Sequence, residues 1–243
     1  MVQGSDRKLN QKVICSDGVL NLHKTERLIN YGNLSYHMVE TINNIKLGII
    51  SLFRSNYFNQ FHIREMAKLI GKSHVSLLPH LKSFEKDKIL LSKSIGKSKV
   101  YSLNLENNQV REFLSLSEKK ESLALLNKEF LIKKIYDEFI SLNLNGCLIL
   151  FGSYASLAHN KESDIDLLYL GELKENEKKN IKEFGKTYDK EIHLASMNLE
   201  QFKEQLSKQG ALIKEILKNH VILYSHDIFI NEVWRHYYER KER

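Results

Sequence analysis

The 243-residue sequence predicts an α+β protein in two parts: an amino-terminal group of helices closed by a hairpin, then a mixed sheet with flanking helices. Apolar residues recur at helical spacing from Ile45 to Phe84, and they alternate with polar residues between Val100 and Leu105. Beyond residue 143, short apolar runs alternate with charged helical stretches. That alternation is typical of a buried sheet with helices on its faces.

Composition narrows the class of protein. Hydrophobic residues make up 42% of the chain, which is enough for a buried core and excludes global disorder. The net charge of +7 is compatible with a polyanionic partner, and equally with lysine-rich solvated helix surfaces. The two cysteines, Cys15 and Cys147, form no disulfide framework, and no apolar run is long enough to span a bilayer. We therefore expect a soluble protein of the cytoplasm.

The first part is expected to begin after a poorly ordered extension, residues 1–37, which shows no sustained periodicity. Within residues 38–110, a first helix precedes a helix over Ile63–Ile70 that ends at Gly71. Ser73 is the expected N-cap of a third helix, and a hairpin with its turn at Gly96 follows. Helix, helix, turn, helix and hairpin form the layout of a winged helix-turn-helix.

Residues 44–105 resemble the winged helix domains of prokaryotic transcription regulators, whose third helix enters the major groove while the wing flanks the backbone. The resemblance implies contacts to duplex DNA. The candidate residues are Lys72, Ser73, His74, Ser76 and His80 on the helix, and Lys93, Lys97 and Lys99 on the wing. Pro79 lies inside the third helix and is expected to kink it. The alternative use of such a wing is dimerisation or contact with another protein.

Residues 111–142 are expected to form a helical linker, with the charge cluster Glu118–Glu121 marking the boundary between domains. Residues 143–243 then form the second domain. Its strands are expected at Cys147–Phe151, Ile165–Leu170, Glu191–Met197 and Val221–Tyr224, with a terminal helix near Asp227–Arg240.

The most informative stretch is LILFGSYASLAHNKESDIDLLYLG, residues 148–171. An apolar strand runs into Gly152–Ser153, and after ten residues Asp164-Ile165-Asp166 enters a second apolar strand. Alternate residues of a strand point the same way, so the two aspartates project side by side. Two such carboxylates repel each other unless a cation lies between them, and Mg²⁺ prefers carboxylates together with phosphate oxygens.

Gly152 and Ser153 complete this predicted site. Gly152 lets the backbone approach a ligand closely, Ser153 adds a hydroxyl, and the helix that follows offers free N–H groups to phosphate. The stretch therefore predicts a site that holds a metal–triphosphate complex.

Phe151-Gly152-Ser153 and Ser163-Asp164-Ile165-Asp166-Leu167 resemble the two motifs of the DNA polymerase beta-type nucleotidyltransferase superfamily, specifically its minimal prokaryotic members. The resemblance covers roughly residues 130–225. It implies an enzyme that binds nucleotide at Gly152 and Ser153 and metal at Asp164 and Asp166, with Mg²⁺ or Mn²⁺ as the cofactor. The expected donor substrate is an NTP, with ATP favoured.

The family adds a third carboxylate on a neighbouring strand, with catalytic and metal-binding roles. Glu191 is the candidate here, although many members carry Asp at this point, and Asp189 is the alternative. A third possibility is that neither takes the role. The ten histidines are scattered, and none is paired with a carboxylate at helical spacing, so no zinc site is expected.

Two functions follow from these patterns. The first is transfer of NMP from an NTP to an unknown acceptor with two Mg²⁺ ions, coupled to a DNA-binding winged helix. Minimal members of the family can act as antitoxins on a partner protein, but the added winged helix departs from that form. The second is a DNA-binding regulator whose nucleotidyltransferase fold senses nucleotide without turnover. Acceptor and oligomeric state are not encoded in any motif.

Overall fold

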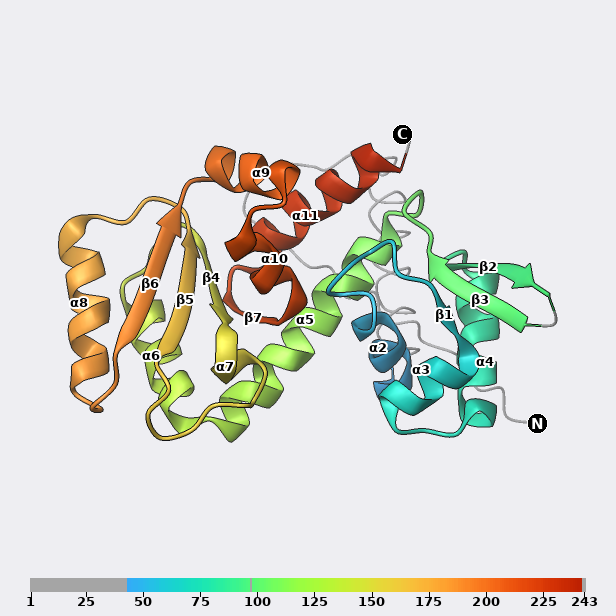
Figure 1. Cartoon of the computed structure of the whole chain (residues 1–243), viewed down its shortest axis with the longest axis horizontal. Coiled ribbons are helices and arrows are strands. Elements are labelled where there is room, and N and C mark those ends of the chain that lie inside the picture. Colours follow the sequence, from blue (N-terminus) through green and yellow to red (C-terminus); the bar gives the residue numbers. More distant parts are fainter. Residues whose placement is uncertain (1–42, 97, 242–243) are drawn as a thin grey trace, which may run out of the picture. The chain divides into compact units, whose positions relative to one another are not determined.

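The structure is a computed structural model that describes residues 43–96 and 98–241. The expected extension over residues 1–37 and the expected wing residue Lys97 lie outside the described residues. Contacts group Asn43–Arg243 into one unit, which Figure 1 shows in sequence colours.

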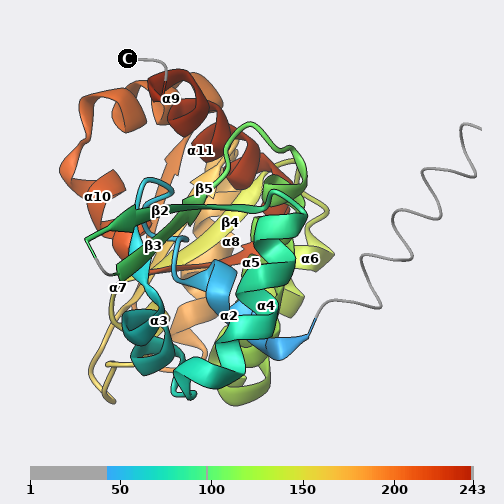
Figure 2. The ribbon, with the colours of Figure 1, turned by 90° about the vertical axis from the view of Figure 1, so that its right-hand side faces the viewer.

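The amino-terminal part consists of three helices and a three-stranded antiparallel sheet of order β1-β3-β2. Figure 2 looks onto this part of the molecule. Its elements are α2 (Asn44–Ser51), β1 (Phe61–His62), α3 (Ile63–Ile70), α4 (His74–Lys86), β2 (Leu90–Ile95) and β3 (Ser98–Leu103). Sequence reasoning missed β1, because two residues carry no detectable periodicity.

The helix ends follow local chemistry. Gly71 terminates α3 with φ +68°, a left-handed conformation that glycine adopts without steric cost. Ser73 caps α4, since its Oγ accepts a hydrogen bond from the N–H of Ser76 at 3.2 Å. Pro79 lies within α4, which continues as one helix to Lys86. Pro79, which is expected to kink the helix, does not end it.

Two helices connect this part to the second sheet. They are α5 (Gln109–Lys128) and α6 (Phe130–Ser141), and the chain leaves helical geometry between them at Glu129. The cluster Glu118–Glu121, which is expected to mark the boundary between domains, lies inside α5. Glu118 is only 2% exposed, because it points inward to the partly buried guanidinium of Arg54 and the buried imidazole of His220. Only those charged residues of a run that lie on the outer face of a helix are solvated.

The carboxyl-terminal part is built on a four-stranded mixed sheet of order β6-β5-β4-β7. β4 is antiparallel to both β5 and β7, while β5 and β6 are parallel. Its elements are β4 (Cys147–Phe151), α7 (Gly152–Ala155), β5 (Ile165–Leu170), α8 (Glu175–Lys186), β6 (Ile192–Met197), α9 (Leu199–Lys208), α10 (Ala211–Lys218), β7 (His220–Tyr224) and α11 (His226–Arg240). The mixed α+β class is confirmed.

One face of this sheet forms a continuous apolar core with α5, α6 and α8. Leu150 and Leu167 are paired in the sheet and wholly buried, and they pack in the same core as Ile135 and Phe139 of α6. The opposite face carries Phe151, Asp166 and their neighbours in register. The core therefore holds the sheet rigid while leaving one end of its other face free for polar groups.

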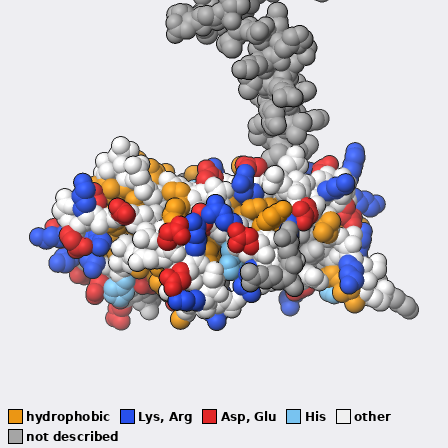
Figure 3. Space-filling view, turned by 90° about the horizontal axis from the view of Figure 1, so that it is seen from above, with side chains coloured by type: hydrophobic (Ala, Val, Ile, Leu, Met, Phe, Trp, Pro, Cys, Tyr) orange, Lys and Arg blue, Asp and Glu red, His pale blue; other side chains and the backbone are white. Residues whose placement is uncertain are grey.

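Charged side chains of both signs are interspersed on the face shown in Figure 3. Within residues 43–96 and 98–241, no helix has the length and apolar character needed to cross a membrane.

Candidate active site

Gly152 lies where β4 ends and the short helix α7 begins, with φ +69°. A Cβ atom built on Gly152 would stand 2.3 Å from Oδ2 of Asp166. The carboxylate of Asp166 therefore lies directly over the glycine backbone. Any side chain at position 152 would displace the carboxylate and would also strain the backbone.

The register of the sheet aligns the polar residues of the site. Phe151 of β4 pairs with Asp166 of β5, and Asp166 pairs with His193 of β6. Paired residues on adjacent strands project to the same face, so Asp166 and His193 lie side by side. Asp164 comes just before β5, two residues earlier, and shares that face.

The imidazole of His193 lies among three carboxylates. Its Nδ1 is 3.3 Å from Oδ1 of Asp166, and its Nε2 is 3.3 Å from Oε1 of Glu191 and 3.8 Å from Oδ2 of Asp164. One ligand atom each from Asp164, Glu191 and His193 lies within 4.8 Å of the others. We call these four residues, Asp164, Asp166, Glu191 and His193, the acidic cluster.

Of the two third-carboxylate candidates, Glu191 belongs to the acidic cluster and Asp189 does not. Glu191 stands immediately before β6, and its carbonyl accepts a hydrogen bond from the N–H of Ile165 at 2.9 Å. Its side chain is 72% exposed. Asp189 occupies the preceding turn with φ +54°. The residue opposite Asp166 in the sheet is His193, which sequence reasoning did not select.

The loop before Asp164 is tied to the turn before β6. The ammonium group of Lys190 donates hydrogen bonds to the carbonyl oxygens of Lys161 and Ser163, the second at 3.1 Å. A cavity of about 490 Å³ opens beside Glu191 and His193 and is also lined by Lys182, Lys186 and Lys190. These lysines bring positive charge next to the acidic cluster.

Ser153 lies in α7, and its carbonyl accepts a hydrogen bond from the N–H of Ala158 at 2.9 Å. The next residue, Tyr154, is buried and stacks on His159 with the ring centroids 4.0 Å apart. Nε2 of His159 lies 3.4 Å from a carboxylate oxygen of Glu129. The loop that leads from the glycine to the aspartates is thereby packed against the start of α6.

The expected DNA contacts lie on α4 and on the β2–β3 hairpin. Lys72, His74 and Lys93 are exposed, whereas Ser76 and His80 are half-buried. Ser73 is used as a helix cap, and Lys99 forms an ion pair with Glu85. Exposed lysines and His74 thus remain on the outer side, but Lys99 is already neutralised within the molecule.

The acidic cluster has the donor set of a divalent cation site. Carboxylate oxygens suit Mg²⁺ and Mn²⁺, and an imidazole nitrogen adds affinity for later transition metals. Because Gly152 has no side chain, the carboxylate of Asp166 fits over its backbone, and the nearby lysines suit phosphate. A strand, a Gly-Ser turn and a second strand bearing Asp-x-Asp therefore converge on a site suited to a metal-bound polyphosphate.

Comparison with known proteins agrees with this geometry. Residues 132–229 match the family described as Polymerase beta, Nucleotidyltransferase, so this part of the chain is similar to a nucleotidyltransferase domain of that type. The match extends from α6 to the start of α11 and contains the whole acidic cluster.

Two other comparisons add little. No curated protein matches the chain. A solved structure titled "Crystal structure of the toxin-antitoxin with AMP-PNP" is similar over 47% of this chain and 91% of that chain, at 17% sequence identity and a TM-score of 0.31. A TM-score this low supports no inference about this chain.

Proposed function

We propose that the protein transfers NMP from an NTP, with ATP as the favoured donor, to a hydroxyl-bearing acceptor, in a reaction that depends on Mg²⁺ or Mn²⁺. The observation that supports this most strongly is the placement of Asp166 over the bare backbone of Gly152, with Asp164 and Glu191 on the same edge. The nucleotidyltransferase match over residues 132–229 supports the same reading.

Asp164 and Asp166 would hold the metal, with His193 and Glu191 completing the ligand set. Divalent ions at such a site neutralise phosphate charge and lower the pKa of an attacking hydroxyl, typically as a pair about 3.5–4 Å apart. Gly152 and Ser153 would bind the triphosphate through backbone N–H groups and a hydroxyl. The positive charges of Lys182, Lys186 and Lys190 would reduce the electrostatic repulsion between the carboxylates and an incoming phosphate.

In the proposed reaction the acceptor oxygen attacks the α-phosphorus in line with the leaving group. A new O–P bond forms, the bond to the bridging α–β oxygen breaks, and pyrophosphate leaves with that electron pair. The acceptor proton passes to Glu191 or His193, the two exposed groups of the acidic cluster nearest the edge of the sheet. Positioning and charge neutralisation supply most of the rate in such transfers.

The direct test uses α-labelled ATP with Mg²⁺ or Mn²⁺, the full-length protein and extract from a prokaryotic cell. Transfer predicts label on a macromolecule or small molecule, together with released pyrophosphate, and neither should form with Asp166→Asn. Absence of any label with all four NTPs and both metals would contradict the proposed activity.

We propose that residues 44–105 form a winged helix that binds duplex DNA. The order of three helices and the β1-β3-β2 sheet supports this. Lys72, just before α4, and Lys93, on the β2–β3 hairpin, are exposed and support it as well. In this arrangement α4 would enter the major groove and the hairpin would follow the backbone.

One observation favours a second function, a DNA-binding regulator that senses nucleotide without turnover. The residue paired with Asp166 in the sheet is His193, an imidazole and not a third carboxylate. Asp164 and Asp166 could still hold metal–nucleotide, while the strand partner of Asp166 would supply no carboxylate for the metal that activates an attacking hydroxyl. Tight metal-dependent ATP binding without label transfer, combined with a change in DNA affinity, would identify the sensor.

A further inference from the structure

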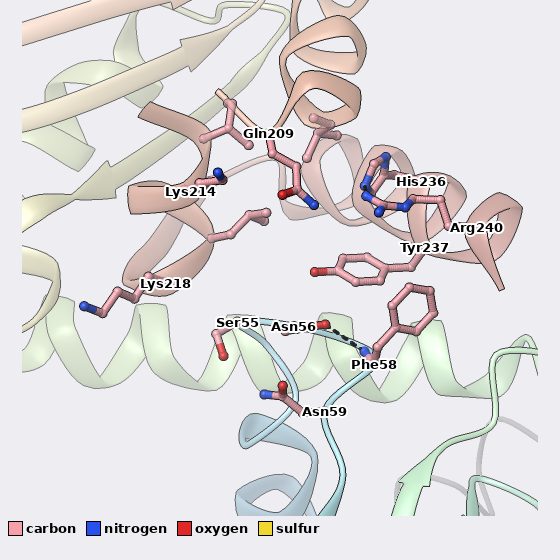
Figure 4. A pocket seen from close by; sticks show the side chains of 13 residues that line it. Ser55, Asn56, Phe58, Asn59, Gln209, Lys214, Lys218, His236, Tyr237 and Arg240 are labelled. Atoms are coloured by element: carbon pink, nitrogen blue, oxygen red, sulfur yellow. Dashed lines mark hydrogen bonds between the residues drawn. The ribbon is translucent and has the colours of Figure 1, made fainter. Parts of the chain in front are cut away.

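A separate cavity of about 370 Å³ lies between three segments that are distant in the sequence (Figure 4). Its walls are the turn after α2 (residues 55–59), the end of α9 with α10, and the last turns of α11. The volume falls within the range of small-molecule sites, roughly 300–1,000 Å³. None of the four residues of the acidic cluster lines it.

The charged residues that line this cavity are all basic. Lys214 and Arg240 contribute two cations, and Lys218 lines the cavity with its ammonium group turned away (Figure 4). Among the described residues that line the cavity there is no aspartate or glutamate. A concave surface lined by charges of one sign concentrates their field. The cavity therefore favours an anionic ligand, and the planar guanidinium of Arg240 matches the geometry of a phosphate.

Arg240 is held in place by its neighbour on α11. Its Nη1 lies 3.2 Å from Nε2 of His236. Burial lowers the pKa of His236, and the charge of Arg240 lowers it further. The neutral ring can thus accept a hydrogen from Arg240 and orient the guanidinium, and Figure 4 shows both side chains on one side of the cavity.

The remaining walls offer groups that suit a nucleobase. The ring of Phe58 is 42% exposed and contacts Tyr237 edge-on, with the centroids 4.9 Å apart. Asn59 and Gln209 bring side-chain amides, which both donate and accept hydrogen bonds as a base edge requires. An exposed aromatic ring beside such amides is a common way to hold an unstacked base.

The backbone of Gln209 has a left-handed conformation, which is unfavourable for any residue that carries a side chain. It caps α9 with φ +51°, a left-handed position where glycine is the usual residue. Figure 4 shows its amide directed into the cavity. The chain thus retains an amide at a position where glycine would make the backbone more stable.

We propose that this cavity binds a nucleoside phosphate, with the phosphate on Arg240 and Lys214 and the base between Phe58 and the amides of Asn59 and Gln209. The proposal does not depend on the transfer reaction, because the two sites share no residue. The ligand would join the turn after α2 to α10 and α11. The same chemistry is offered by a free nucleotide and by the phosphorylated end of a nucleic acid strand.

The test is isothermal titration of the full-length protein in EDTA, with AMP in one arm and a 5′-phosphorylated trinucleotide in the other. EDTA removes the metal on which binding at the acidic cluster depends. We expect at least one ligand to bind, and to bind Asp166→Asn with unchanged affinity. Binding by AMP identifies a free nucleotide, and binding by the trinucleotide alone identifies a strand end. No binding of either ligand at millimolar concentration would overturn the proposal.

Three variants locate the binding. Arg240→Gln should weaken it by about 10-fold or more, since a charged hydrogen bond is lost. Gln209→Gly should weaken it while raising the melting temperature, which separates loss of contact from misfolding. Lys208→Gln removes the same charge from α9 outside the cavity and should have little effect. Equal losses in Arg240→Gln and Lys208→Gln, or loss in Asp166→Asn, would place the ligand elsewhere and overturn the proposal.

Discussion

Asp166 and His193 face each other across the parallel strands β5 and β6, with Oδ1 of the aspartate 3.3 Å from Nδ1 of the imidazole. This pairing puts an imidazole nitrogen beside the aspartates, at an edge where only carboxylates were expected. It bears directly on which metal the proposed site would prefer.

We expect His193→Asp to shift the metal preference toward Mg²⁺. Imidazole favours Ni²⁺ and Zn²⁺, whereas an all-carboxylate site favours Mg²⁺. The ratio of Ni²⁺ to Mg²⁺ affinity, measured by titration calorimetry, should fall by about 10-fold or more, which is about 1.4 kcal/mol. His74→Asp, on exposed α4, serves as the control and should leave the ratio unchanged. An unchanged ratio in His193→Asp would exclude His193 as a ligand.

Gly152→Ala should abolish metal and nucleotide binding and destabilise the fold. The added Cβ would meet Asp166 at 2.3 Å, and φ +69° is strained for alanine. Gly71→Ala is a matched control, because φ is +68° there and nothing lies within 4 Å of the added Cβ. Both variants should lose about 1 kcal/mol of stability or more from backbone strain. Only Gly152→Ala should lose ligand binding, and equal binding in both would contradict the assigned role of Gly152.

Asp164→Asn and Asp166→Asn should each lower NMP transfer by at least about 100-fold, because metal coordination supplies several kcal/mol of transition-state stabilisation. Without metal, the melting temperature should stay the same or rise slightly, since repulsion between two partly exposed carboxylates is relieved. Glu191→Gln, assayed in the same way, tests the third carboxylate. If it keeps full turnover, the proton-accepting role passes to His193. A purely structural aspartate pair predicts lower thermal stability and no dependence on metal.

Stability should fall in two stages as the solution is acidified. Burial lowers the pKa of His226 from 6.5 to about 4, so protonation favours the unfolded chain as the pH falls through that range. Burial acts to raise the pKa of Glu118, but His220 and Arg54 outweigh it and lower the pKa to about 2. The stabilisation from Glu118 is therefore complete above about pH 4.5 and is lost as the pH falls toward 2.

Urea unfolding at a series of pH values measures both stages. His226→Gln should flatten the curve between pH 6.5 and 4 and leave the lower stage in place. Glu118→Gln should remove the lower stage and cost about 3 kcal/mol at pH 7, because Arg54 keeps a largely buried charge without its partner. A pH-independent unfolding free energy over this range would show that neither group is shifted.

DNA binding should depend on salt and on the exposed lysines of the amino-terminal part. Affinity of the full-length protein for duplex DNA should fall with a log–log slope of about −0.9 per phosphate contacted. Changing Lys72 and Lys93 together to alanine should make this slope shallower. Lys99→Ala should change it less, since Lys99 is paired with Glu85. A salt-independent signal, or no binding at low ionic strength, would contradict the DNA-binding proposal.

Features governed by neighbouring residues could be predicted from the sequence. The bounds of α3, β4 and β5 agree with the periodicity, because an apolar run and its flanking glycine or polar residue set the ends locally. Gly71 and Ser73 act as helix caps for the same reason. The placement of Asp164 and Asp166 on one edge needs only the two-residue repeat of a strand.

Features governed by distant residues required the tertiary structure. His193 reaches Asp166 only because β5 and β6 pair in parallel with one register, and a shift by one residue would turn it to the other face. In the sequence, Glu118 belongs to what looks like a surface charge run. In the structure it contacts Arg54, 64 residues earlier, and His220, 102 residues later. Such pairings depend on how whole elements pack, and no local pattern records them.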